Sequence, residues 1–333
     1  AATARRSPRM LPPAGVRAYM CSTRVNNSRR MWRRVAAAAT AGPAAVLTAQ
    51  MWWVRMKFQL PPDARGPSAG VCAPPHASAR PGKDRQRNIV FLGDSIVTGV
   101  GCSAKASEED GPVMPRRVAG ILAQQLGVTV RWKCLGETGA DVRMLRERLL
   151  PSLEEEVERA SGAEQRVDAV VVMTGLNDIK ECFLFVQPSL HPWRFGSMLT
   201  SLLESVCEAA GAGCALLVPG HPIEVTPRFN QFWPLSAAVR TTTRLWEDQK
   251  RLAANQAQAH MSEAHQARSG SAAAAATPEG PFIHYLEPTP AMVAQLSNGA
   301  DYFASDGMHP NDAGYALWAE IIAQTLLRQW GVE

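Results

Sequence analysis

Ser95 stands where a serine hydroxyl could act as a nucleophile, directly after an apolar run that is rich in β-branched residues. The run at 88–93 (NIVFLG) is typical of a buried strand, and Gly93-Asp94-Ser95 ends it. The backbone N–H of a residue at such a strand end is free to face a bound anion as the next helix begins. Gly, Asp and Ser are also common turn formers, so the triplet alone does not define a site.

Asp306 and His309 could supply the base that a serine nucleophile needs. A hydroxyl attacks only when a base removes its proton, and an acceptor must hold that base in the right tautomer. The two residues lie three apart in the run DGMHPN, just before the last predicted helix, so one loop can fold the carboxylate onto the imidazole. They could instead be ordinary polar residues of a helix-entry loop. Their predicted position at the same sheet edge as Ser95 favours the catalytic interpretation.

Two further strand ends carry residues that could stabilise an oxyanion. Asn177, in the run GLND at 175–178, follows the third predicted strand, and its amide could donate to a tetrahedral intermediate. Donors of this kind are worth about 3 kcal/mol where they have been removed. Gly139 follows the second strand, where the lack of a Cβ lets the backbone approach a ligand. Taken alone, the Asn177 motif is also plausible as a turn, and a strand-to-helix turn is the likelier explanation of the Gly139 motif.

The elements that must position these residues alternate between strand and helix. Such alternation predicts right-handed βαβ units and an α/β fold, a three-layer αβα sandwich around a five-stranded parallel sheet. Ligands of such sheets collect beyond the carboxyl ends of the strands, where every motif above lies. The predicted strands are 88–93, 128–135, 167–174, 215–219 and 282–286, and the predicted helices are 115–126, 141–150, 195–210, 235–267 and 311–330.

From residue 87 to 330 the sequence resembles the SGNH hydrolases, a branch of the GDSL esterase and lipase superfamily. The four family blocks occur in order, as GDS at 93–95, Gly139, GLND at 175–178 and DGMH at 306–309. The third block departs from the GTND of many members, and residues 99–110 are less regular than usual. Residues 49–64, which end in LPPDA, look like the region before the domain in a bacterial-type subgroup.

This resemblance implies a flavodoxin-like fold and an esterase or lipase activity. It assigns Ser95 as nucleophile, His309 as base and Asp306 as the partner of the base. The oxyanion hole would consist of the Ser95 N–H, the Gly139 N–H and the Asn177 side chain.

Apolar residues in the loops that follow the third and fourth strands predict a hydrophobic acyl pocket. The candidates in the fourth-strand loop are Ile223, Phe229, Phe232 and Trp233, although these side chains could simply pack beneath their own loop. His221 lies in the same loop and is interpreted as structural.

Charge and motif content argue against nucleic-acid, metal and nucleotide binding. Residues 1–62 hold ten Arg, one Lys and no acidic residue, so the remainder has 24 basic against 30 acidic residues, a net charge of −6. The overall basic pI therefore gives no reason to expect nucleic-acid binding. The histidines form no ligand cluster, and neither GxGxxG nor GxxxxGK occurs, so no metal and no cofactor are expected. The seven dispersed cysteines lack the spacing of a disulfide scaffold or a zinc site.

The chain divides into a basic segment (1–57), a Pro/Gly-rich linker (58–87) and a hydrolase-like domain (88–333). Residues 35–54 are uncharged and flanked by arginines, a length that could span a bilayer. They could form a membrane anchor, part of a cleaved transit peptide, or an apolar helix packed on the domain. The Arg-rich, acid-free start predicts a membrane-anchored or organellar protein, in a plastid or mitochondrion.

The resulting expectation is a serine esterase whose partner is an acyl-ester substrate, with membrane association through 35–54 as a further possibility. One alternative is an acyltransferase that uses the same site and passes the acyl group to a sugar or lipid hydroxyl. Another is a catalytically silent, membrane-tethered binding protein.

Overall fold

The computed structural model describes residues 42–75, 86–163, 165–183, 191–211, 213–269 and 280–332. The chain divides into two units, Ala1–Met56 and Lys57–Glu333. Residues 42–57 are helical. Among the helices in the described ranges, none has the length and apolar character needed to cross a membrane. Part of the apolar stretch predicted as a span, residues 35–41, lies outside the described residues.

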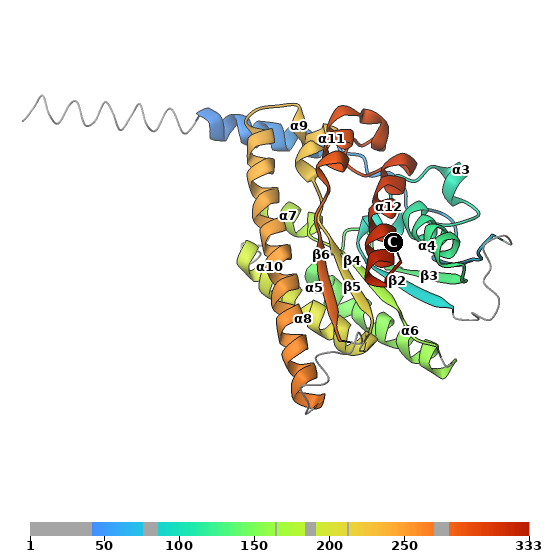
Figure 1. The fold of residues 1–333 in the computed structure, drawn as a ribbon. Helices are drawn as coiled ribbons and strands as arrows, with labels where there is room; N and C mark the ends of the chain where they lie inside the picture. Colours follow the sequence, from blue (N-terminus) through green and yellow to red (C-terminus); the bar gives the residue numbers. More distant parts are fainter. Residues whose placement is uncertain are drawn as a thin grey trace, which may run out of the picture. The chain divides into compact units, whose positions relative to one another are not determined.

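The second unit is built on one sheet with the strand order β1-β3-β2-β4-β5-β6 (Figure 1). Strands β2 to β6 are parallel and correspond to the five predicted strands, so the α/β fold class is confirmed. The strands are β1 (Ala69–Cys72), β2 (Arg87–Gly93), β3 (Val130–Gly136), β4 (Ala169–Met173), β5 (Ala215–Pro219) and β6 (Phe282–Leu286).

The sheet has six strands rather than the predicted five, because β1 adds an antiparallel edge to β3. This strand lies in the Pro/Gly-rich stretch that was predicted as a linker. Its four residues are too few to show the apolar pattern from which a strand is predicted. Gly70 lies so close to the Trp132 ring that a Cβ at this position would be 2.7 Å from it. A glycine is therefore required for the edge strand to pair here.

The strand order places a topological switch point between β2 and β4. The connection from β2 leads to β3 on one side, whereas the following parallel strand, β4, pairs with the other side of β2. Ligands of open parallel sheets bind in the crevice at such a point, beyond the carboxyl ends of the strands. Ser95 follows β2 and Asn177 follows β4, so the topology alone brings these two residues to one place.

Helices cover both faces of the sheet. On one face, alternate residues of β2 and β4, such as Phe91 and Val171, share a hydrophobic core with α4 (Val113–Leu126) and α12 (Asp312–Gln329). On the other face α8 (Pro192–Ala210) contacts both α10 (Leu235–Ser269) and α6 (Leu150–Gly162). In Figure 1, α8 and α10 lie to the left of α4 and α12. The remaining helical segments are α2 (Ser95–Thr98), α3 (Ala104–Ser107), α5 (Val142–Met144), α7 (Leu176–Phe183), α9 (Pro227–Asn230) and α11 (Pro290–Asn298).

The helix predicted at 141–150 is divided by a π-helical turn. Its start is confirmed, since the Asp141 carboxylate accepts hydrogen bonds from the Arg143 and Met144 amides as an N-cap. The π turn at Leu145–Leu149 then separates α5 from α6. Short 3₁₀ turns lie at Ile223–Val225 and Ala300–Tyr302.

Candidate active site

Ser95 is the first residue of α2, where the chain turns sharply away from the end of β2. A Cβ on Gly93 would lie 2.3 Å from the Met173 carbonyl oxygen, so only glycine allows β2 and β4 to meet so closely here. The Asp94 carboxylate caps the helix by accepting from the Ile96 amide. The helix ends after one turn at Gly99, whose φ of 77° is left-handed. This turn holds the Ser95 side chain in a buried position at the switch point.

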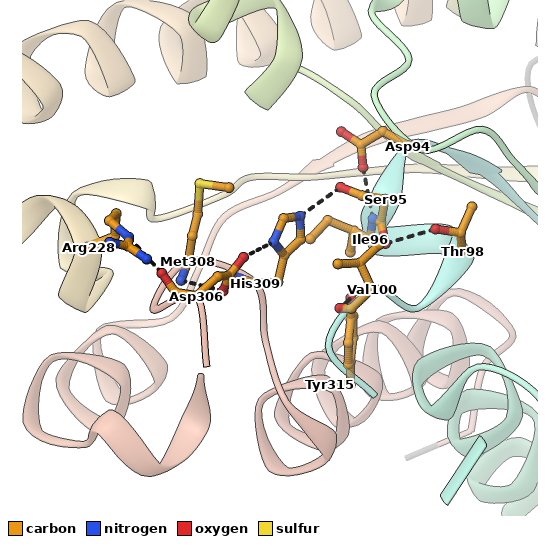
Figure 2. A network of polar contacts seen from close by, with 10 residues as sticks. All are labelled: Asp94, Ser95, Ile96, Thr98, Val100, Arg228, Asp306, Met308, His309 and Tyr315. Atoms are coloured by element: carbon orange, nitrogen blue, oxygen red, sulfur yellow. Dashed lines mark hydrogen bonds and ion pairs between the residues drawn. The ribbon is translucent and has the colours of Figure 1, made fainter. Parts of the chain in front are cut away.

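Three side chains from the two ends of the domain form one hydrogen-bonded chain (Figure 2). The His309 Nδ1 lies 2.5 Å from Asp306 Oδ2, and His309 Nε2 lies 2.9 Å from Ser95 Oγ. The carboxylate accepts the Nδ1 proton, which leaves Nε2 as an acceptor for the serine hydroxyl. All three side chains are buried. The arrangement can therefore move a proton from the hydroxyl to the imidazole.

The loop that carries Asp306 and His309 is fixed by its own backbone. Asp306 Oδ1 accepts from the Met308 and His309 amides at 2.9 and 3.0 Å, and the His309 carbonyl accepts from the Ala304 amide. Burial alone would raise the pKa of Asp306. The hydrogen bonds from the His309 ring and from these amides outweigh that effect, and the pKa lies below its usual value. The carboxylate is therefore ionised when it faces the imidazole.

Arg228 supports this loop from outside and was not singled out by the sequence analysis. Its Nε donates to the Asp306 carbonyl at 2.7 Å (Figure 2). Its backbone amide donates to the Gly307 carbonyl at 2.9 Å. An arginine in a short loop helix has no sequence pattern that would have revealed this contact.

Gly139 and Asn177 lie in two strand-end loops that contact the turn carrying Ser95, through Thr138 and Thr98 and through Asn177 and Asp94. Gly139 has a left-handed φ of 89° and open space on the side where a Cβ would project. Asn177 donates from Nδ2 to the Ala140 carbonyl at 3.0 Å and to Asp94 Oδ2 at 3.2 Å. Its Oδ1 accepts from Lys180 at 2.9 Å, which fixes the amide with its nitrogen toward Asp94.

A segment from before β1 ties α2 to the Gly139 loop. The Asp63 carboxylate accepts from the hydroxyls of Thr98 and Thr138, and the Ala64 amide donates to the Thr98 carbonyl. Asp63 belongs to the LPPDA stretch, and Thr138 directly precedes Gly139. The segment therefore bridges two of the strand-end loops that meet at the site.

A small cavity is lined by Ile96 and Met308, the sequence neighbours of Ser95 and His309, but not by the side chains of Ser95, His309 or Asp306. Of the four predicted pocket residues, Ile223 lines it, whereas Phe229, Phe232 and Trp233 do not. The Phe232 and Trp233 side chains are 42% and 70% exposed. The full lining consists of Ile96, Leu176, His221, Pro222, Ile223, Thr226, Leu296, Phe303, Met308, Pro310, Gly314 and Trp318.

Lys250 is a buried cation on α10, at a position where the sequence predicts only a helix. Its Nζ donates to Glu247 Oε1 and to His221 Nδ1, each at 2.8 Å. The Tyr285 hydroxyl donates to the other oxygen of Glu247 at 2.9 Å. The charge of Lys250 is thus paired inside the protein, behind the wall of the cavity that His221 forms.

Asp178 is buried beside the site, and its ionised form is disfavoured there. Burial, with the neighbouring charges of Asp141 and Asp94, outweighs the hydrogen bond from the Val142 amide and raises the pKa of Asp178 to about 7. In the unfolded chain this pKa is about 3.9. Because the folded pKa is the higher one, the folded state loses stability as the pH rises toward 7, by about 1.4 kcal/mol per pH unit.

We therefore expect Asp178→Asn to raise the Tm at pH 8 and to change it much less at pH 4.5. Asparagine keeps the acceptor for Val142 and removes the titrating group. Thermal unfolding at both pH values checks this, with Asp248→Asn as an exposed control. If Asp178→Asn changed the Tm by the same amount at both pH values, the raised pKa of Asp178 would be contradicted.

Comparison with known proteins identifies the family. The GDSL-like lipase/acylhydrolase family matches residues 91–317. A variant of Axe2, an acetyl-xylooligosaccharide esterase from Geobacillus stearothermophilus, is similar at 19% identity and a TM-score of 0.49, over 74% of this chain and 95% of that chain. The lipase Lip_vut3 from a goat rumen metagenome is similar at 14% identity and a TM-score of 0.47, over 72% of this chain and 96% of that one.

No match is found among curated proteins. The family match nevertheless spans more than half of the chain, and it includes Ser95, Gly139, Asn177 and His309. The protein belongs to the GDSL-like lipase/acylhydrolase family and is a carboxylic ester hydrolase.

Proposed function

We propose that the protein hydrolyses acyl esters in two steps, with Ser95 as the nucleophile. The observation that carries this proposal is the hydrogen-bond chain from Ser95 Oγ through His309 to Asp306. His309 takes the hydroxyl proton as Oγ attacks the ester carbonyl, and then gives it to the departing alcohol. Water, activated by the same imidazole, cleaves the acyl-serine and regenerates the enzyme. Asp306 holds the ring and stabilises the imidazolium.

The negative oxygen of each tetrahedral intermediate is held by three donors in this proposal. They are the Ser95 N–H, the Gly139 N–H and the Asn177 amide. The left-handed turn at Gly139 and the open space beside it support a backbone donor there. To donate to the oxyanion, Asn177 must turn one N–H away from its present acceptor. The 3.2 Å hydrogen bond to Asp94 is the longer and weaker of its two, so this bond is the one that the oxyanion would replace.

Asn177→Ala is expected to lower kcat by about 10²- to 10³-fold, with a smaller change in KM. Its amide acts on the developing oxyanion rather than on the bound ester, so the loss falls on the transition state. Steady-state kinetics on a p-nitrophenyl ester measure this, with Asn298→Ala at the exposed end of α11 as the matched control. A kcat unchanged by Asn177→Ala would remove Asn177 from the oxyanion hole.

Covalent labelling tests the nucleophile directly. A fluorophosphonate reacts with a serine that an adjacent base activates, and mass spectrometry of the digested protein locates the modified residue. We expect one labelled serine, Ser95, with labelling lost in Ser95→Ala. Labelling that persists in this variant at the same rate would contradict the proposed function.

A further inference from the structure

A cavity borders the loops that carry Ser95 and His309, and its lining includes none of the proposed site residues themselves. Its wall includes one sequence neighbour of each of three proposed site residues: Ile96 follows Ser95, Leu176 precedes Asn177, and Met308 precedes His309. Its volume is about 50 Å³. One water molecule occupies roughly 10–15 Å³, so a cavity of this size suits a short acyl group. Because the cavity is open on one side, a longer acyl chain would have to extend out of it.

The cavity wall is almost entirely apolar, apart from His221 and Thr226. The Thr226 hydroxyl donates to the Ile223 carbonyl at 2.8 Å and is therefore satisfied. The His221 Nε2 has no hydrogen-bond partner within the described part of the chain, although the side chain is buried. Other described residues also have a buried side-chain atom without a hydrogen-bond partner, but among them only His221 lines this cavity.

A buried hydrogen-bond chain decides which nitrogen of His221 carries the proton. Lys250 can only donate, so His221 Nδ1 accepts from Lys250 Nζ. Glu247 in turn accepts from both Lys250 and Tyr285, which fixes the ammonium in place. Burial and the Lys250 charge lower the pKa of His221 well below its usual value, so the ring is neutral. The single ring proton is therefore on Nε2, and that N–H is the unpartnered group.

We propose that this cavity is the acyl pocket and that it selects short acyl groups carrying an oxygen acceptor, to which the His221 Nε2–H donates. The proposal rests on the esterase function proposed above. An unpartnered N–H inside a pocket penalises a purely apolar occupant, whereas an ether or carbonyl oxygen satisfies it. His221, interpreted from the sequence as structural, is here a specificity residue.

Two esters of nearly identical shape isolate the hydrogen bond. In p-nitrophenyl methoxyacetate an ether oxygen replaces one methylene of p-nitrophenyl butyrate, and both acyl groups place three non-hydrogen atoms beyond the carbonyl carbon. The ratio of their kcat/KM values is divided by the ratio of their rates of hydrolysis by hydroxide, which corrects for intrinsic reactivity. We expect this corrected ratio to favour the methoxyacetyl ester by about five- to tenfold.

Variants of His221 separate the donor from the shape of the wall. His221→Phe fills the same space without a donor, and we expect it to bring the corrected ratio to near one while butyrate hydrolysis changes less than the methoxyacetate reaction. His221→Gln can accept from Lys250 and still donate, so it is expected to retain part of the preference. Trp233→Ala, which alters an exposed side chain outside the cavity, is expected to leave the ratio unchanged.

A second variant keeps the test valid if His221→Phe fails to fold. Ile223→Ala enlarges the cavity, and we expect it to raise kcat/KM for a hexanoyl ester relative to an acetyl ester, while Trp233→Ala does not. A corrected ratio near one in the unchanged protein, or one that His221→Phe leaves intact, overturns the inference while Ser95-dependent hydrolysis persists. Hydrolysis that does not depend on Ser95 overturns the proposed function as well.

Discussion

Ser95→Ala is expected to lower kcat for a p-nitrophenyl ester by about 10⁶-fold, leaving only the small contribution of binding and the oxyanion donors. No acyl-enzyme can form without Oγ, and the buried site offers no other nucleophile in hydrogen-bond contact with His309 among the described residues. The change removes one oxygen and leaves the Asp306–His309 pair intact. The fold should therefore persist, with a far-ultraviolet spectrum and a Tm close to those of the unchanged protein.

The matched control for this experiment is Ser297→Ala. Ser297 is exposed on α11, where its hydroxyl donates only to the helix backbone, so its removal should leave kcat unchanged. Equal rates for Ser95→Ala and the unchanged protein would refute the nucleophile. A rate lowered equally in both serine variants would point instead to a general loss of folded protein.

His309→Gln is expected to cost about as much as loss of the nucleophile, roughly 10⁶-fold in kcat, because the hydroxyl then has no base. Glutamine has similar bulk and can hydrogen-bond to Ser95, but it cannot accept a proton at neutral pH. Combining it with Ser95→Ala should lower kcat no further, since the two residues act as one unit. Kinetics on the two single variants and the double variant measure this.

His284→Gln provides the comparison, because it makes the same chemical change on strand β6 outside the hydrogen-bond chain. It should keep normal kcat and normal reaction with a fluorophosphonate, whereas His309→Gln should react with the label far more slowly. If the loss of kcat in the double variant equalled the product of the two single losses, Ser95 and His309 would contribute independently. That result would contradict a proton transfer that needs both residues.

The parallel strands and the residues at their ends could be predicted from sequence for one physical reason. A strand buried on both faces needs a continuous apolar run, and β2 and β4 are such runs. Parallel strands point their carboxyl ends to one edge, so the runs also predicted that Ser95 and Asn177 would lie together. The structure places Ser95 and His309 within hydrogen-bond distance.

What could not be predicted depends on tertiary packing of short or exposed segments. Strand β1 has four residues and forms only because β3 offers an unpaired edge. Lys250 is a charged residue on a long helix, a pattern typical of a solvated face, and only its pairing with the partly buried Glu247 and the buried His221 explains its burial. Likewise, Ile223 and Trp233 lie in one apolar loop, but packing decides that the first lines the cavity and the second faces solvent.

Ser95 and His309 are separated by 214 positions along the chain. Bringing them together requires closure of a very long loop, and this contact is therefore expected to be among the last to form. During synthesis from the N-terminus, the hydroxyl and its strand are finished well before the imidazole leaves the ribosome. A nascent chain is consequently inert toward esters and toward fluorophosphonates until its closing helix has docked, so reactivity with such a probe reports completed folding.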